Sequence, residues 1–372
     1  MDSKVSQFVT DASEAESMAK SLSLPSVQHL LPHLVNSAQS LARPPISNFH
    51  VGAVGLGSDG RVFFGVNLEF PGVPLHHSVH AEQFLITNLA VHRCPRLLSL
   101  AVSAAPCGHC RQFLQELRLS SSLKIHITAD SEDCTENLEL NGGLKDLTFK
   151  PLPEILPNPF GPHDLLDQET PLLLESHHNR LDLSTINDAS NPRNRCDGNS
   201  NVGKLSNDNG EKHDLHEARL RKSALEAANS AYAPYSGCPS GVALMDCEGK
   251  VYRGSYIESA AYNPSLGPVQ AALVAYVAGG VGGYERIVAA VLVEKEVAKV
   301  RQEDTARMIL KAISPKCELK GYLEKLLRPM VCSVNLWWSS RRGDRKSETH
   351  PKIISRGRLN TSEETKLVVL KR

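Results

Sequence analysis

The feature that most constrains the fold of this chain is an internal repeat. Residues 52–69 align without gaps with residues 241–258, at an offset of 189 residues. Within this alignment, Asp59-Gly60-Arg61-Val62 matches Glu248-Gly249-Lys250-Val251. Two hairpins can share Gly and Asp by chance, because turns favour these residues. The constant offset favours duplication, so the 372 residues are expected to hold two copies of one fold.

The first copy has the pattern of a mixed α/β fold. Apolar residues three and four positions apart predict a helix over 26–42. Apolar segments at 48–56 and 61–66, on either side of Ser58-Asp59-Gly60, predict a β-hairpin. The remaining elements are expected as two helices and two strands, at 80–91, 107–117, 97–104 and 123–128. This β-β-α-β-α-β order favours a sheet covered by helices.

Composition divides the chain into six segments. They are a polar N-terminal segment (1–21), the first α/β domain (22–150), a connecting arm rich in Pro and Leu (151–183), an Asn-rich linker (184–213), the second copy (214–320) and a basic tail (321–372). The linker has few large apolar side chains, too few to offset the entropy of ordering it, and we expect it to be flexible.

The charges are balanced overall but unevenly distributed. The chain has 41 Lys and Arg against 41 Asp and Glu, whereas residues 321–372 have 12 against 5. Residues 1–320 therefore carry a net charge of −7, which argues against a body built to bind polynucleotides. No apolar run is long enough to span a membrane or to serve as a signal peptide. With nine cysteines and no export signal, a reducing, cytoplasmic location is expected.

The strongest chemical signal is a set of potential metal ligands. In Pro106-Cys107-Gly108-His109-Cys110 the two cysteines place their sulfurs on one side of the first turn of a helix. The helix N-terminus stabilises the thiolate form that binds metals. His80 precedes another predicted helix and can supply a third ligand, which leaves a fourth position open for water. The alternatives are a redox pair, or a structural zinc site with Cys94 or His109 as the fourth ligand.

Glu82 lies two residues beyond His80 and completes a recognised pattern. A carboxylate close to the metal can take a proton from a water molecule and return it elsewhere. The combination H-x-E and P-C-x-x-C is the signature of zinc-dependent deaminases. We therefore expect a catalytic zinc site.

Four segments resemble those of cytidine deaminases: PPISNFHVGAVGL, FFGVNLEF, SVHAEQ and PCGHCRQFLQEL. The 27-residue step from His80 to Cys107 is similar to that of the two-domain homodimeric class of this family. The resemblance covers roughly residues 22–170 and 215–320. It implies two three-layer α/β/α lobes, each a mixed sheet with helices on both faces, with a catalytic N-terminal lobe and a degenerate C-terminal lobe.

The resemblance also implies a role for each residue of the site. His80, Cys107 and Cys110 would hold one zinc ion per chain, and Glu82 would shuttle protons. The residues expected to contact the substrate are Phe49 (pyrimidine face), Asn67 and Glu69 (ribose hydroxyls) and Ala81 (base, through its backbone). Arg111 follows Cys110 directly, and we expect its guanidinium to donate to the cysteine sulfurs.

The second copy has lost this chemistry. At the 189-residue offset, the positions of His80, Glu82, Cys107 and Cys110 hold Val269, Ala271, Glu296 and Lys299. No H-x-E or P-C-x-x-C follows residue 214, so the second lobe is expected to be structural.

The expected function is the zinc-dependent hydrolysis of cytidine and 2′-deoxycytidine to uridine and 2′-deoxyuridine, with release of ammonia, in pyrimidine salvage. The expected assembly is a cytoplasmic homodimer without membrane or nucleic-acid partners. Two alternatives remain at this point. One is a polynucleotide cytosine deaminase. The other is a catalytically impaired homologue that acts as a binding or scaffold partner, because the resemblance stops near Lys320 while the chain continues.

Overall fold

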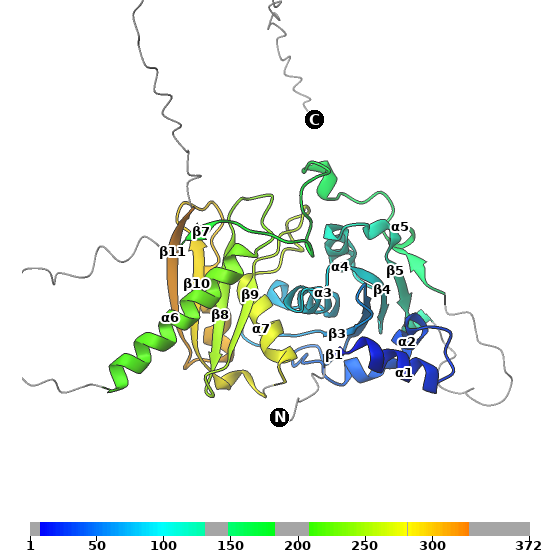
Figure 1. Cartoon of the computed structure of the whole chain (residues 1–372), viewed down its shortest axis with the longest axis horizontal. Coiled ribbons are helices and arrows are strands. Elements are labelled where there is room, and N and C mark those ends of the chain that lie inside the picture. Colours follow the sequence, from blue (N-terminus) through cyan, green and yellow to red (C-terminus); the bar gives the residue numbers. More distant parts are fainter. Residues whose placement is uncertain (1–7, 131–147, 183–207, 281, 327–372) are drawn as a thin grey trace, which may run out of the picture. The chain divides into compact units, whose positions relative to one another are not determined.

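The computed structural model describes residues 8–130, 148–182, 208–280 and 282–326, with side chains from residue 215 in the third range (Figure 1). Within these ranges the chain forms two α/β lobes. Most of the predicted linker (184–213) and of the basic tail (321–372) lies outside the described residues. No described helix is both long and apolar enough to cross a membrane.

The first lobe contains a six-stranded sheet in the order β1-β3-β2-β4-β5-β6. Its strands are β1 (Val9–Thr10), β2 (Gly52–Gly57), β3 (Val62–Val66), β4 (Leu97–Val102), β5 (Lys124–Ile127) and β6 (Lys150–Pro151). Only β4 and β5 pair in parallel; the other neighbours are antiparallel. The helices of this lobe are α1 (Ala12–Ser21), α2 (Val27–Gln39), α3 (Ala81–Val91), α4 (Gly108–Phe113) and α5 (Leu152–Ile155).

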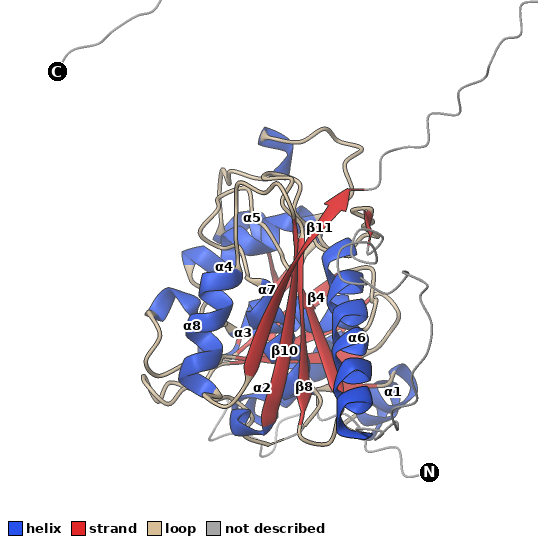
Figure 2. Ribbon diagram, turned by 90° about the vertical axis from the view of Figure 1, so that its left-hand side faces the viewer, coloured by secondary structure: helices blue, strands red, loops and turns tan. Residues whose placement is uncertain are grey.

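The second lobe repeats the order of the four central strands, β3-β2-β4-β5, as β9-β8-β10-β11. Its sheet has the order β7-β11-β10-β8-β9, with β7 (Leu181–Asp182), β8 (Ser240–Asp246), β9 (Val251–Ser255), β10 (Ile287–Lys295) and β11 (Glu318–Leu326). Again one pair, β10 and β11, is parallel. The helices are α6 (Asp208–Asn229), α7 (Pro268–Ala278) and α8 (Glu303–Ile313). The duplication predicted from the sequence is therefore present, and helices lie on both sides of the sheet (Figure 2).

Two glycines show why the repeat retains Gly at this position. A Cβ atom on Gly65 would lie 2.2 Å from the backbone oxygen of Ala81 in α3. A Cβ atom on Gly254 would lie 2.0 Å from the backbone nitrogen of Ala272 in α7. Each glycine thus lets a helix pack directly against a strand of its sheet, and any larger residue would force the two apart.

Two isolated β-bridges correct the alignment of the two copies beyond the hairpin. The bridge between Leu68 and Val79 corresponds to the bridge between Ile257 and Leu266, so the offset falls from 189 to 187 residues before the helix. The structural equivalent of His80 is therefore Gly267, the N-cap of α7, and Glu82 is matched by Val269. The pairing expected at the fixed offset was wrong because the loop before α7 is shorter. The conclusion that these positions carry no metal ligand is unchanged.

Residues before position 22 are part of the first lobe. Phe8 is buried and its ring stacks on that of Phe84, with 5.1 Å between centroids. The strand β1 pairs with β3, and α1 packs on α2. The domain boundary placed at residue 22 thus does not coincide with a boundary of the fold, because one buried aromatic side chain anchors a segment that is otherwise polar.

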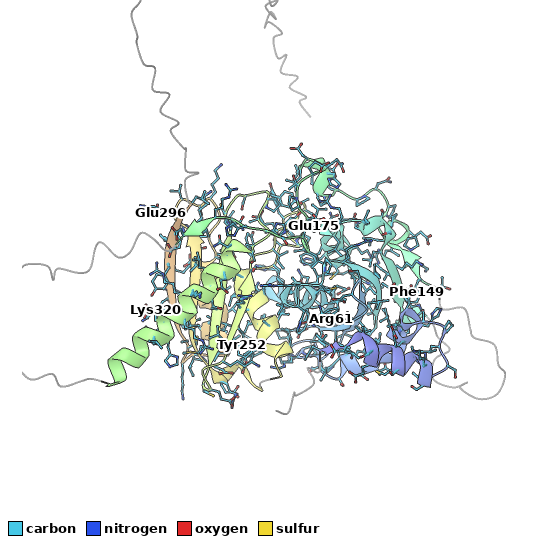
Figure 3. The ribbon with its side chains drawn as sticks, viewed as in Figure 1. Arg61, Phe149, Glu175, Tyr252, Glu296 and Lys320 are labelled. Atoms are coloured by element: carbon cyan, nitrogen blue, oxygen red, sulfur yellow. The ribbon has the colours of Figure 1, made fainter. Side chains whose placement is uncertain are left out.

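The second lobe likewise continues past Lys320, which lies on β11 (Figure 3). β11 runs to Leu326 and pairs with β10 on one side and with β7, from the connecting arm, on the other. Glu324 on this strand is fully buried and pairs with Arg221 of α6 at 2.6 Å. The first residues assigned to the tail therefore belong to the sheet.

The lobes contact each other through a buried interface. Helices α3 and α7 pack together, and the Gln83 amide donates to the backbone oxygen of Pro264 at 2.9 Å. Glu116, which ends the short 3₁₀ helix Leu114–Glu116, is fully buried and accepts three hydrogen bonds from the second lobe. The donors are the hydroxyls of Tyr232 (2.9 Å) and Tyr235 (2.6 Å) and the backbone N–H of Ala260 (2.8 Å).

Candidate metal centre

The three predicted ligands come from the N-terminal ends of two helices. His80 is the N-cap residue of α3, Cys107 is the N-cap residue of α4, and Cys110 lies in the first turn of α4. The Nδ1 atom of His80 is 3.3 Å from the Cys110 sulfur and 3.5 Å from the Cys107 sulfur. All three potential ligand atoms lie within 4.8 Å of one another. One imidazole and two thiols at such distances suit a tetrahedral zinc ion.

No fourth ligand joins this group among the described residues. Cys94 is buried away from it, with its sulfur 3.5 Å from the backbone oxygen of Arg96. The ring of His109 stacks on that of His80, with centroids 5.1 Å apart and an interplanar angle of 13°. Three ligands leave one coordination position for a reactant, as in catalytic zinc sites. The redox-pair alternative gives no reason for an imidazole next to both sulfurs.

The local electrostatics favour a thiolate at the centre. Hydrogen bonds with Cys110 and His80 lower the pKa of Cys107 to about 3. The same bond with Cys107, together with burial, raises the pKa of the Cys110 thiol. The hydrogen bond to Cys107 also raises the pKa of His80. The group therefore holds negative charge on its more exposed sulfur, as a cation-binding site requires.

Glu82 lies directly beside the three ligands, in the first turn of α3. Its side chain is 4% exposed, and this burial raises the pKa of the carboxyl group. A raised pKa brings a carboxyl group closer to the range in which it can both accept and return a proton near neutral pH. The position of Glu82 thus fits the proton-transfer role expected from its spacing.

A pocket of about 460 Å³ opens over this group and collects the other predicted residues. Phe49, Asn67, Glu69 and Ala81 line it together with His80, Glu82 and Cys107. Phe49 stands at its rim with 60% of its surface exposed. The buried Cys110 does not line the pocket. The sequence analysis missed several lining residues without chemical motifs, namely Ile46, Ser47, Val51, Leu75, Ser78, Val79, Ala104 and Ala105.

Asn67 and Glu69 are held by the loop that carries Phe49. The Asn67 amide accepts from the Val51 N–H at 2.9 Å and donates to the Phe49 carbonyl at 2.8 Å. Glu69 accepts from the N–H groups of Ile46 and Ser47, both at 2.9 Å, and from the Ser47 hydroxyl at 2.6 Å. Both side chains therefore shape the pocket wall and keep spare hydrogen-bonding capacity.

Arg111 does not take the position expected for it. Its guanidinium donates to the backbone oxygens of Pro106 at 2.6 Å and Ile155 at 2.8 Å, and not to the cysteine sulfurs. Arg111 extends from the outer part of α4 to α5 and so fixes the cysteine loop through its backbone. The expected contact fails because the next residue along a helix points about 100° away from Cys110.

These features define a class of protein: an α/β enzyme with a three-ligand zinc centre, an adjacent buried carboxyl group and a pocket large enough for a small molecule. Comparison with known proteins agrees. Residues 25–124 match the family model described as the cytidine and deoxycytidylate deaminase zinc-binding region, and residues 152–307 match a second model with the same description. His80, Cys107 and Cys110 provide a donor set that fits zinc.

The chain belongs to the cytidine and deoxycytidylate deaminase family. It is 57% identical to "Cytidine deaminase 1" of Arabidopsis thaliana over 318 residues, which is 85% of this chain and 97% of that protein. It is 39% identical to "Probable inactive cytidine deaminase 4" of the same organism over 321 residues, 85% of this chain and 95% of that one. The crystal structure of cytidine deaminase from Mycobacterium tuberculosis matches with 30% identity and a TM-score of 0.29, covering 36% of this chain and 97% of that chain.

Proposed function

We propose that this protein hydrolyses cytidine and 2′-deoxycytidine to uridine and 2′-deoxyuridine, with release of ammonia, as a step of pyrimidine salvage. The observation that carries the proposal is the group of His80, Cys107 and Cys110 with Glu82 beside it, three of which line one pocket of a deaminase-family fold. The second lobe lacks this set and supports the first through the buried interface.

The residues of the pocket divide the reaction among them. His80, Cys107 and Cys110 would hold a zinc ion, which would supply a Lewis acid able to lower the pKa of water to about 7. The Glu82 carboxylate takes the proton of the attacking water and delivers it to the ring nitrogen next to C4. After the water oxygen has added to C4, Glu82 takes the second proton from the new C4 hydroxyl and gives it to the amino group. The C4–N bond then breaks, ammonia leaves, and the hydroxyl oxygen becomes the carbonyl of the product. Burial raises the pKa of the Glu82 carboxyl group, which brings it closer to the range in which it can both accept and return a proton.

Binding of the nucleoside uses the rim and the wall of the pocket. The exposed ring of Phe49 offers a face for the pyrimidine. Among the described residues, only the Ser47 hydroxyl donates a hydrogen bond to Oε1 of Glu69, so this oxygen retains a lone pair for a sugar hydroxyl. The amide of Asn67 is oriented by its two backbone partners and can add one bond to the sugar.

A neutral nucleoside fits this pocket better than a phosphorylated substrate. No lysine or arginine lines the pocket in the described part of the chain, while Glu69 and Glu82 both do. A phosphate group needs cationic or N–H partners to offset its charge. This charge pattern also disfavours a polynucleotide substrate.

We also propose a cytoplasmic homodimer. The large apolar side chains at the pocket rim support an association, since Phe49 is 60% exposed and Leu75 is 70% exposed. The cytoplasmic location is supported by the free cysteines of the described residues. Light scattering of the purified chain tests the mass, and a monomer at micromolar concentration would contradict the dimer.

The experiment that tests the function compares four substrates at known zinc content: cytidine, 2′-deoxycytidine, 2′-deoxycytidine 5′-monophosphate and a single-stranded oligonucleotide. Both nucleosides should be converted, with kcat/KM at least about 10²-fold above the phosphorylated substrates, a common magnitude for one unmatched buried charge. Faster turnover of the oligonucleotide would overturn the proposal. If a chain with one bound zinc converts none of them, the scaffold alternative holds.

The Glu82→Gln variant tests the mechanism separately. It should keep its zinc and lose at least about 10² in turnover, because Gln matches the shape of Glu and cannot transfer the proton. Glu16→Gln, on the exposed face of α1, is the matched control and should retain full activity. Retained turnover in Glu82→Gln would remove Glu82 from its role.

A further inference from the structure

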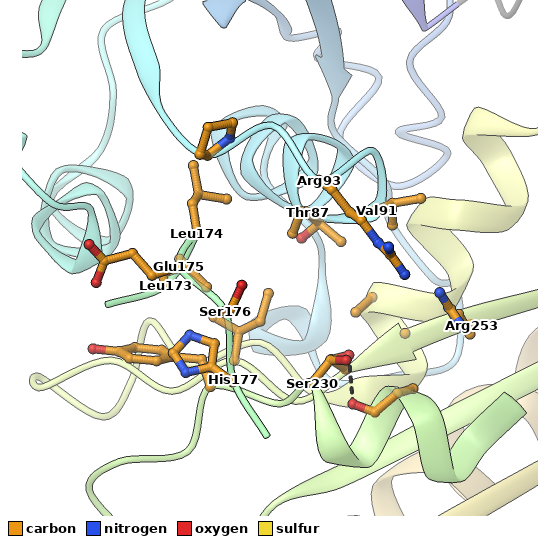
Figure 4. A pocket seen from close by; sticks show the side chains of 18 residues that line it. Thr87, Val91, Arg93, Leu173, Leu174, Glu175, Ser176, His177, Ser230 and Arg253 are labelled. Carbon is orange, nitrogen blue, oxygen red and sulfur yellow. Dashed lines mark hydrogen bonds between the residues drawn. The ribbon is translucent and has the colours of Figure 1, made fainter. Parts of the chain in front are cut away.

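A second cavity, larger than the first-lobe pocket, lies between the two lobes (Figure 4). Its volume is about 600 Å³, within the usual range of small-molecule sites. The C-terminal half of α3, the arm at Leu173–His177, the end of α6, the strand β9 and the helix α7 supply its walls. It shares no lining residue with the first-lobe pocket. It is therefore a separate site and not an extension of the proposed active site.

The two lobes contact each other differently on the two sides of the interface, and the cavity lies on one of these sides. Arg43 and Tyr232 are equivalent, since each forms the same parallel bridge in its lobe, Arg43 with Leu68 and Tyr232 with Ile257. Arg43 reaches across to the second lobe, where it donates to the Gly282 carbonyl at 3.0 Å and covers the ring of Tyr284. Tyr232 instead directs its hydroxyl to Glu116, at 2.9 Å. On this side, the loop after α3 contributes Arg93 and Pro95 to the cavity wall.

The inner wall offers apolar surface and hydrogen-bond acceptors. The hydroxyl protons of Thr87, Ser230 and Ser255 are used by backbone carbonyls, so only their oxygen lone pairs remain for a ligand. The Nε2 atom of His177 is 3.0 Å from the Leu172 carbonyl, which makes it the donor and leaves Nδ1 as an acceptor. Burial lowers the pKa of His177 and keeps this ring neutral. Such a wall suits a ligand that carries its own hydroxyl or N–H donors.

The opening of the cavity carries positive charge from both lobes. Arg93, after α3, and Arg253, on β9, extend from opposite sides toward this opening (Figure 4). The Arg93 guanidinium forms no hydrogen bond or ion pair with the described residues. Arg253 pairs with Glu226, but their side chains are 44% and 48% exposed, so this ion pair is weak.

The acidic residue that lines the cavity does not cancel this charge. Glu175 is held by two hydrogen bonds from Arg118, at 2.8 Å and 3.0 Å. Of the three charged side chains that line the cavity, Arg93 is therefore the one that has no ion-pair partner among the described residues. Guanidinium groups recognise phosphate through paired hydrogen bonds, and two of them at one opening make a phosphate-binding arrangement.

We propose that the inter-lobe cavity binds a phosphorylated small molecule that bears hydroxyl or N–H donors, a nucleotide or sugar phosphate. The phosphate lies between Arg93 and Arg253, and the hydroxyl-bearing part contacts Ser230, Ser255 and His177. Because its walls come from both lobes, the ligand binds only the assembled pair of lobes. This site is independent of the proposed deaminase activity, which concerns the other pocket.

Isothermal titration calorimetry on the full chain tests the proposal. The probes are adenosine 5′-monophosphate, adenosine and inorganic phosphate. We expect the monophosphate to bind with a Kd below about 1 mM, and the other two at least about tenfold more weakly, because each lacks one half of the contacts. Equal binding of inorganic phosphate would overturn the proposed ligand class. No binding of the monophosphate at 5 mM would overturn the site itself.

Variants locate the binding. Arg93→Gln removes an exposed charge and should weaken the binding of the monophosphate at least about tenfold. Arg93→Lys keeps the charge without the paired hydrogen bonds, so its affinity should lie between those of the unmodified chain and Arg93→Gln. Arg96→Gln is the matched control, since Arg96 is exposed on the same loop and does not line the cavity. Its affinity should stay within twofold of the unmodified chain. Equal affinity of the Arg93→Gln and Arg96→Gln variants would show that the monophosphate binds elsewhere.

Discussion

Glu116 offers a direct test of how the second lobe supports the first. Glu116 lies just after α4, the helix whose N-cap is Cys107 and whose first turn holds Cys110. Its carboxyl group accepts three hydrogen bonds from the other lobe. We predict that Glu116→Ala destabilises the whole described fold and not only one surface, because it removes the shared partner of all three donors.

The magnitude follows from the groups left without partners. Tyr232 is 1% exposed, and its hydroxyl would keep only the hydroxyl of Tyr235, at 3.2 Å, so one of these two hydroxyl protons would lose its acceptor. The buried N–H of Ala260 would lose its partner as well. A buried donor that loses its partner costs about 1–3 kcal/mol. The effects of neighbouring groups are not additive, and relaxation or an entering water molecule recovers a part. We therefore expect a loss of about 2–4 kcal/mol in the free energy of unfolding, the cost of two buried donors without acceptors less the part recovered by relaxation.

Thermal unfolding measures this loss. At about 2–4 °C per kcal/mol for a fold of this size, the midpoint should fall by about 10 °C. Glu303→Ala is the matched control, because Glu303 forms an exposed ion pair with Arg307 within α8, and it should change stability by less than about 0.5 kcal/mol. If both variants unfold within 2 °C of each other, the three hydrogen bonds of Glu116 contribute no net stability, and the reasoning fails.

Three further predictions concern pH, chain length and zinc. Burial raises the pKa of Glu116 above its usual 4.5, so the folded state holds this proton more tightly than the unfolded state does. The stability that this proton contributes is present below pH 4.5 and is lost as the pH rises through the folded-state pKa. Thermal midpoints from pH 4.5 to 8 should therefore show the stability of the original chain falling relative to Glu116→Gln; a constant difference would contradict the shift. A chain ending at Lys320 should unfold at least about 5 °C below one ending at Leu326, because it loses the β11 residues that pair with β7 and the buried Glu324; equal midpoints would contradict the role of this strand. Metal analysis should find one zinc per chain and close to none after Cys110→Ala; two per chain would contradict the loss of ligands in the second lobe.

The parts of the fold that the sequence predicts are those set by local pattern. The hairpin of β2 and β3 and the helix α3 appear where periodicity and turn residues place them. The metal group was predictable because its chemistry needs specific residue types at fixed spacing. The structure brings His80, Cys107 and Cys110 together as expected.

The parts that the sequence does not predict depend on contacts between distant segments. Glu116 has the pattern of an exposed helical residue, but α4 ends at Phe113 and the following 3₁₀ turn directs the side chain into the interface. The hydrogen bonds of Arg111 to the backbone depend on the position of α5, which no local pattern specifies. The inter-lobe cavity has no sequence signal because its walls come from five separate elements.

Comparison of the two lobes separates residues that build the fold from residues that do chemistry. In the second lobe, Glu258 accepts from the N–H groups of Tyr235 and Ser236 and from the Ser236 hydroxyl, as Glu69 does from Ile46 and Ser47. This arrangement persists in a lobe whose metal position holds Gly267, so its main role is to brace the loop against the sheet. Glu69 therefore combines two roles. Its three hydrogen bonds serve the fold, since Glu258 forms the equivalent three in the second lobe. Only the remaining lone pair of Glu69 is available to a substrate.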